Sequence, residues 1–89
     1  MAGIIGFGNS KLLQFNGQIS DANVSEQGLN IVGAGSSNIP ENSCPYGGML
    51  VTLVFGSEGY YMMQFLTERG ATKGWFRVKS DSWRYWVQL

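Results

Sequence analysis

The stretch GMLVTLVFG, from Gly48 to Gly56, decides the fold. Successive side chains of an extended run point to opposite faces of a sheet, and glycines bound this run on both sides. The two sets are Met49, Val51, Leu53 and Phe55 on one face and Leu50, Thr52 and Val54 on the other. Because both sets are largely apolar, the pattern predicts a central strand that is covered on both faces.

Three more alternating runs follow in the chain. They are YYMMQFLT (residues 60–67), WFRVKS (75–80) and WRYWVQL (83–89). Turn-forming residues separate the runs at 57–59, 69–74 and 80–82, so the spacing predicts a four-strand antiparallel meander. In the last run the alternation puts Trp83 and Trp86 on opposite faces, with Trp83 in the core.

Upstream of the meander, GLNIVGAG (28–35) reads as one more strand, with Leu29, Ile31 and Gly33 facing the core. Residues 36–48 have the composition of a long loop, which Ile39 and Tyr46 would hold against the sheet. No stretch of ten or more residues has helical spacing. The sequence therefore predicts an all-β class: a small antiparallel β-sandwich or knob built on the C-terminal meander.

A length of 89 residues predicts one domain with a modest core. We expect the domain to span residues 28–89 and residues 1–27 to be an N-terminal connecting segment, the remnant of a shaft. A short strand around Leu12–Phe15 is an open alternative within that segment. Charged residues make up only 13% of the chain, about half the usual ~25%. With so small a core and so few charges, we expect the chain to associate with copies of itself.

The residue inventory argues against an enzyme. The chain has no histidine and one cysteine, Cys44, which excludes Ser–His and Cys–His pairs and an internal disulfide. Its acidic residues form no close cluster, so we expect no metal and no cofactor. A glycosidase would need two converging acids, and the candidates Glu58 and Glu68 lie at turn ends. We therefore assign no catalytic residue.

The charge and hydropathy patterns also exclude two classes of partner. No apolar run reaches the ~18 residues of a membrane span, so membrane insertion is not expected. Six basic and six acidic residues cancel, and the basic ones form no dense stripe of the kind that binds a polyanion. A nucleic-acid partner is not expected either.

The candidate binding residues are aromatic and basic side chains on the last two predicted strands. Sugars offer apolar faces and many hydroxyls, which aromatic rings and polar groups bind together, and cations can hold the indoles flat. The candidate glycan-binding residues are Trp75, Arg77 and Lys79 on one strand and Arg84, Trp86 and Gln88 on the next. The alternative, left open for Trp75 and Trp86, is that the indoles pack in the core or at a subunit interface.

The order of motifs from residue 28 onward carries a resemblance. The motifs are GLNIVGAG, SNIP (37–40), YGGMLVTLVFG, MMQF, WFRVKS and a terminal W-x-x-W-x-x-L formed by Trp83, Trp86 and Leu89. This order resembles the small C-terminal knob domains of phage tail fibres, tailspikes and pyocin fibres. The chain departs from that pattern where Cys44-Pro45-Tyr46 precedes the glycines and where residues 79–82 lack a glycine, which bears on the loops more than on the fold.

The resemblance implies a trimeric knob at the tip of a virion fibre, working outside the cell. It implies a homotrimer, upstream fibre or spike domains, and a bacterial surface polysaccharide or lipopolysaccharide as the receptor. The alternative is a trimerisation and folding cap of a viral fibre that binds no ligand. The two hypotheses differ in one respect: a binding module should leave a tryptophan exposed beside polar side chains, whereas a cap should bury all three.

Overall fold

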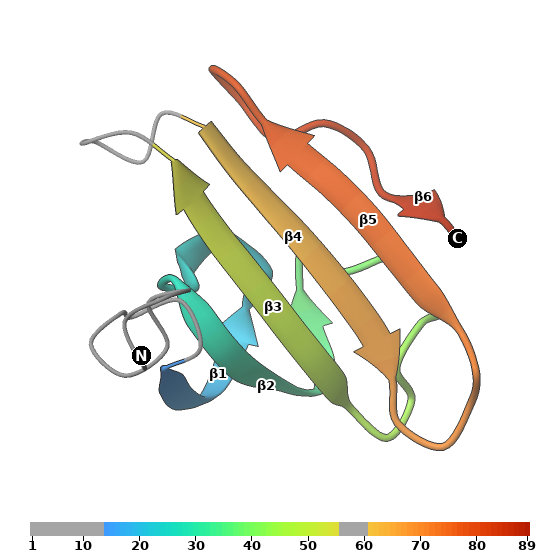
Figure 1. Cartoon of the computed structure of the whole chain (residues 1–89). Helices are drawn as coiled ribbons and strands as arrows, with labels where there is room; N and C mark the ends of the chain where they lie inside the picture. The colour runs from blue at the N-terminus through green and yellow to red at the C-terminus, as the bar shows by residue number, and fades with distance from the viewer. Residues whose placement is uncertain (1–13, 56–60) are drawn as a thin grey trace, which may run out of the picture.

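The computed structural model of this chain describes residues 14–55 and 61–89. Six strands form one sheet in which the spatial order follows the chain order (Figure 1). The all-β class is confirmed. Leu12, the turn predicted at 57–59 and Tyr60 lie outside the described residues. The elements are β1 (Phe15–Asp21), the 3₁₀ helix η2 (Ala22–Val24), β2 (Gly28–Ser37), β3 (Gly48–Phe55), β4 (Tyr61–Glu68), β5 (Gly74–Lys79) and β6 (Val87–Gln88).

The predicted meander is confirmed. Strands β2 to β6 pair antiparallel, each with the next in the chain. In the centre of the sheet Val51 lies opposite Phe65, and Phe65 lies opposite Phe76. The alternation that places partners on one face therefore runs unbroken across β3, β4 and β5.

Strand β1 makes the sheet mixed, whereas a purely antiparallel one was predicted. It runs parallel to β2, with Phe15 opposite Leu29 and Ile19 opposite Val32. A parallel pair needs a crossover between its strands. Here the chain leaves β1 at Asp21, continues through η2, and returns at Gly28 to the end of the sheet where β1 began.

A sandwich of two sheets was predicted, but the structure has a single sheet with one covered face. The 3₁₀ helix and parts of the connection at 38–47 lie against that face, behind the sheet as drawn in Figure 1. The core forms beneath them, and no second sheet lies on the other face among residues 14–55 and 61–89. The core residues are Ala22, Val32, Cys44, Leu50, Leu66 and Trp75, with Ile19, Ile39 and Trp86 packed against them.

The inward face of β2 was predicted wrongly. The structure buries Asn30 and Val32, and Ile31 on the opposite face is 39% exposed. Asn30 lies opposite Leu50 on the covered side, where its amide Nδ2 donates to the carbonyl of Glu26. That hydrogen bond keeps a polar side chain inside, at a position where the apolar pattern favoured its neighbours.

The connection between β2 and β3 follows the prediction at one of its two anchors. Ile39 packs against the core as expected. Tyr46 does not, because its side chain is 75% exposed. Cys44 occupies the buried place instead, at 0% exposure, and burial raises the pKa of its thiol.

The sheet begins before the expected domain boundary at Gly28. Strand β1 pairs with β2, and Ala22 from η2 is fully buried in the core. The carbonyl of Gln14 also accepts a hydrogen bond from the backbone N–H of Leu29 (2.7 Å). Residues 14–27 are therefore part of the domain and not a connecting segment. Residues 1–13 lie outside the described part of the chain.

The C-terminal run is less regular than the strand predicted over 83–89. Lys79 bridges to Trp83, while Phe76 pairs with Val87. Phe76 and Lys79 are three residues apart on β5, whereas their partners Val87 and Trp83 are four residues apart. The C-terminal segment therefore contains one extra residue, which interrupts the alternation of its side chains. As a result Trp83 and Trp86 turn to the same side, whereas opposite faces were predicted.

Asp21 ends β1 and caps η2. Its Oδ1 accepts a hydrogen bond from the backbone N–H of Asn23 (2.9 Å) and another from the side-chain amide of Asn38 (2.8 Å). These two bonds, the one from Asn38 first, hold the pKa of the carboxyl below its ordinary value of 3.8. The cap ties the crossover to the start of the long connection.

A depressed carboxyl pKa predicts a loss of stability in acid. Asp21 stabilises the fold above its unfolded-state pKa, and that contribution is lost as the pH falls through the lower folded-state value. Because the carboxyl is partly exposed, we expect the difference to amount to a few degrees in Tm at most. Melting temperatures from pH 6 down to about pH 2 should fall less steeply in Asp21→Asn than in the wild type. Identical slopes for Asp21→Asn and the wild type would contradict the capping role.

Candidate functional site

The predicted binding residues on β5 point to the covered face. Trp75 is 8% exposed and belongs to the core cluster, and Arg77 is 5% exposed. Lys79, the third residue of this set, is half-buried, with its Nζ 5.8 Å from the ring centre of Trp83. Their shared face was predicted correctly. Its burial leaves Trp75 and Arg77 no open surface on which a sugar could stack.

Arg77 lies between two tryptophans. Its guanidinium carbon is 3.9 Å from the ring centre of Trp83 and 4.4 Å from that of Trp86. Trp86 is fixed in turn, because its indole N–H donates to the carbonyl of Asn38 (3.0 Å). The register shift described above makes this arrangement possible, since it brings both indoles to the same side of the chain.

The guanidinium is also the end of a buried hydrogen-bond network. Arg77 Nε donates to Gln64 Oε1 (2.7 Å), and an Nη donates to Asn23 Oδ1 (2.8 Å). Gln64 Nε2 lies within hydrogen-bond distance of the Ala22 carbonyl (2.7 Å) and the Ser25 hydroxyl (2.8 Å). The network joins β4 and β5 to the crossover and leaves Arg77 bonded on its edge and stacked on its faces.

The electrostatics of this site follow from burial. The two acceptors that Arg77 contacts, on Gln64 and Asn23, are amide oxygens, which carry no charge. Desolvation lowers the pKa of Arg77 to about 10, and the more distant carboxylate of Asp21 opposes the shift. The side chain stays charged at neutral pH, with the indole faces in place of a counter-ion.

The other predicted residues do not join this cluster into an exposed patch. Arg84 and Gln88 are exposed, and Trp86 is half-buried against Arg77. The prediction also omitted Trp83, which lies nearer to Arg77 than Trp86 does. The contacts of Arg77 with Trp83 and Trp86 hold the C-terminal segment against the covered face.

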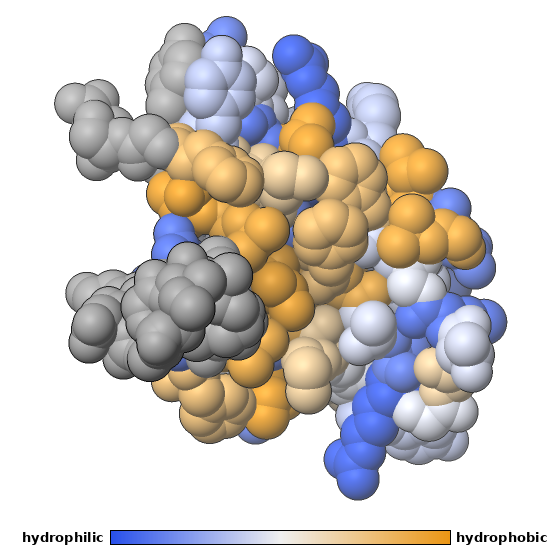
Figure 2. All heavy atoms as spheres, viewed as in Figure 1, coloured by the Kyte–Doolittle hydropathy of each residue, from blue (hydrophilic) through white to orange (hydrophobic). Residues whose placement is uncertain are grey.

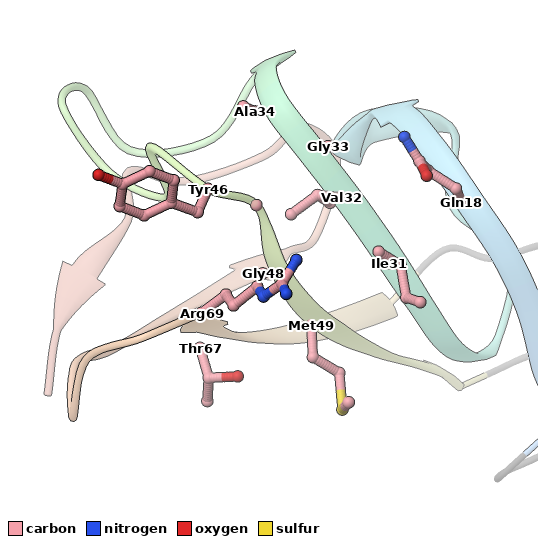
Figure 3. Close-up of a pocket in the computed structure, with 11 residues that line it drawn as sticks. Gln18, Ile31, Val32, Gly33, Ala34, Tyr46, Gly48, Met49, Thr67 and Arg69 are labelled. Atoms are coloured by element: carbon pink, nitrogen blue, oxygen red, sulfur yellow. The ribbon is translucent and has the colours of Figure 1, made fainter.

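A separate groove of about 590 Å³ opens at the end of the sheet where β3 begins (Figure 3). Its floor is apolar and includes Ile31 and Met49, which are both exposed, with the buried Val32 behind them. Figure 3 shows Tyr46 and Gln18 at opposite ends, with Arg69 between them. The groove thus combines an exposed aromatic ring, a cation and an amide around an apolar floor, which is the usual composition of a small-ligand site.

Glycine backbone brings the two rim residues of the groove together. Gly47 has φ +92°, and a Cβ there would lie 2.7 Å from the Val32 carbonyl oxygen, so the turn can approach β2 only without a side chain. The Gly47 carbonyl accepts a hydrogen bond from the N–H of Arg69 (2.9 Å). Tyr46 and Arg69, far apart in the sequence, consequently border one depression.

Sequence reasoning missed this groove. The paired glycines after Tyr46 were the available signal, because they mark a close approach of backbones. The pairing of Gly48 with Glu68 then places these glycines beside the turn that carries Arg69. Neither residue type nor spacing identified Arg69 or Gln18.

No protein-family model, no curated protein and no solved structure matches this chain. Within the described ranges, no group of three or more His, Cys, Asp or Glu side chains is arranged to hold a metal ion. The same residues contain no helix with the length and apolarity needed to cross a membrane.

Proposed function

We propose that this chain is the non-catalytic receptor-binding tip of a phage tail fibre or tailspike, and that it binds bacterial surface glycan in the groove beside Tyr46. The observation that carries the proposal is the pairing of an exposed aromatic ring with polar groups over an apolar floor. A ring of this kind can stack on the apolar face of a sugar, while Arg69 and Gln18 offer donors to hydroxyl or acidic groups.

This proposal moves the ligand from the predicted residues to the groove. The edge and faces of Arg77 are already occupied by Gln64 and by two indoles. A ligand there would have to displace contacts that hold the C-terminal segment. Tyr46 and Arg69, in contrast, are both exposed and can meet a ligand without rearrangement of the core.

The alternative is a trimerisation and folding cap of a viral fibre that binds no ligand. One observation favours it: all three tryptophans take part in packing, Trp75 in the core and Trp83 and Trp86 against Arg77. In this alternative the groove is a surface depression only, and the domain serves to close and hold together the end of a fibre.

Glycan binding is tested with an array of bacterial O-antigen and capsule polysaccharides, followed by calorimetry on any polysaccharide that binds. We expect Tyr46→Ala and Arg69→Ala each to weaken binding about tenfold, the equivalent of about 1.4 kcal/mol. Tyr85→Ala is the matched control, because Tyr85 is 94% exposed and does not line the groove.

Three outcomes separate the two functions. Binding by the wild type that falls in the groove variants, but not in Tyr85→Ala, supports the proposal. Absence of binding by a folded wild type to the host's surface polysaccharides would favour the cap. Binding that persists in both groove variants but fails in a folded Trp86→Ala variant would return the site to the aromatic cluster.

A further inference from the structure

The face of the sheet opposite the 3₁₀ helix is apolar across its full width. The register aligns one residue from each strand into a row that crosses the face from edge to edge. Figure 2 shows apolar residues gathered over this part of the sheet. The row consists of Phe15, Leu29, Val51, Phe65, Phe76 and Val87.

Neighbouring rows extend the same apolar surface. Ile31 and Met49 pair on one side of the row, and Leu53, Met63 and Val78 align on the other. None of these positions carries a charged side chain. Met49 is 51% exposed and Val87 is 59% exposed, and the residues between them, such as Val51 and Phe65, are partly exposed. We call this surface the open face.

Polar residues lie on the covered face instead of the open one. Thr52, Gln64 and Arg77 align on the three central strands, and all three are buried beneath the crossover. An antiparallel sheet with one solvated face normally shows the reverse, with polar side chains toward water. The covered face is therefore an interior with hydrogen-bonded polar side chains. The open face has the apolar composition that is usual for an interior.

The open face is large enough for a specific interface. The six strands lie about 4.8 Å apart and range from two residues in β6 to ten in β2, with a mean of about seven, so the sheet has a footprint of about 500 Å². Two such faces together bury about 1,000 Å², which is about the area that a specific association needs. An apolar patch of this extent on a small domain marks a surface made to be covered.

We propose that the open face is a self-association surface, and that its occupant is the open face of a second copy of this chain. Two copies can meet there without bringing like charges together, because none of the face residues named above is charged. Sheets that pack face to face lie about 10 Å apart and interdigitate apolar side chains, which these rows supply from both sides. The second copy provides the layer that the fold lacks.

This inference does not depend on the ligand of the groove. Ile31 and Met49 belong to both surfaces, so the groove lies at the margin of the open face. Its rim residues Tyr46 and Arg69 come from turns beyond the central row. Association and glycan binding can therefore be measured on separate variants, and the failure of one leaves the other standing.

The first test is the mass of the wild-type chain by light scattering at about 100 µM. We expect about 20 kDa, twice the 9.8 kDa of one chain. Val51→Lys, at the centre of the row, should shift this value to about 10 kDa, whereas Tyr85→Lys should leave it unchanged. A wild-type value near 10 kDa would overturn the proposal, as would a folded Val51→Lys variant that still associates.

A measurement on the wild type alone covers the case in which Val51→Lys does not fold. Hydroxyl-radical footprinting is compared at about 1 µM and about 100 µM chain. Oxidation of Met63, on the open face, should slow by about fivefold at the higher concentration, while that of Tyr85 stays constant. An equal rate for Met63 at two concentrations between which light scattering shows the mass to rise from one chain to two would show that another surface is involved, and would refute self-association here.

Discussion

Replacing Arg77 with alanine is expected to lower the free energy of unfolding by about 3–5 kcal/mol. The substitution removes two charge-assisted hydrogen bonds, which contribute about 1.5–3 kcal/mol each, and leaves Gln64 Oε1 buried without its donor. It also removes the cation between Trp83 and Trp86 and opens a cavity there. Urea unfolding followed by tryptophan fluorescence measures the loss directly, because two of the indoles stack on this side chain.

Two further variants separate charge from shape. Arg77→Lys keeps the charge but not the planar group that stacks and donates along its edge, so its stability should fall between those of the wild type and Arg77→Ala. Arg84→Ala removes an exposed guanidinium and should cost no more than about 0.5 kcal/mol. Equal stabilities for Arg77→Ala and Arg84→Ala would mean that the stacked network does not hold the C-terminal segment.

The strands could be predicted from the sequence because their signal is local. Alternation within Gly48–Phe55, together with the turn-forming residues around it, specifies a strand without knowledge of any distant contact. The same holds for β4 and β5, whose mutual register follows from a short turn. The parallel strand β1 was missed, because its partner lies beyond a crossover that has no sequence signature in this chain.

The inside of the sheet could not be predicted, because both faces are apolar in β3. Buried Thr52 and Gln64 settle the choice only through hydrogen bonds to Ser25 and Ala22, which are 27 and 42 residues away. Without those partners, a glutamine in a strand reads as a solvent-facing residue. The face of β5 that carries Arg77 was therefore taken for a binding surface, and Leu29 and Ile31 were taken for residues facing the core.

The candidate site was predicted in part. Trp75, Arg77 and Lys79 do share a face, as their spacing requires. The cluster they enter depends on one extra residue before Val87, which turns Trp83 toward Arg77. Such a register shift follows from pairing between strands and not from the order of residue types, so alternation alone could not reveal it.

Replacing Gly28 with alanine is expected to cost about 3–5 kcal/mol, enough to unfold much of a domain whose total stability is of the order of 4–13 kcal/mol. Gly28 has φ +124°, a conformation that residues with a Cβ rarely adopt. A Cβ there would also collide with the carbonyl oxygen of Gln14. That oxygen cannot retreat freely, because it accepts the hydrogen bond from Leu29 that joins the beginnings of β1 and β2.

Gly70→Ala is the matched control for backbone strain. Gly70 also has a positive φ, +86°, but a Cβ there would meet nothing within 4 Å, so only the strain of about 1–2 kcal/mol applies. The difference in unfolding free energy between the two variants therefore measures the close approach of β1 to β2. If Gly28→Ala lost no more stability than Gly70→Ala, the segment before β1 would not be held against Gly28, and the parallel pair would have to begin further along the chain.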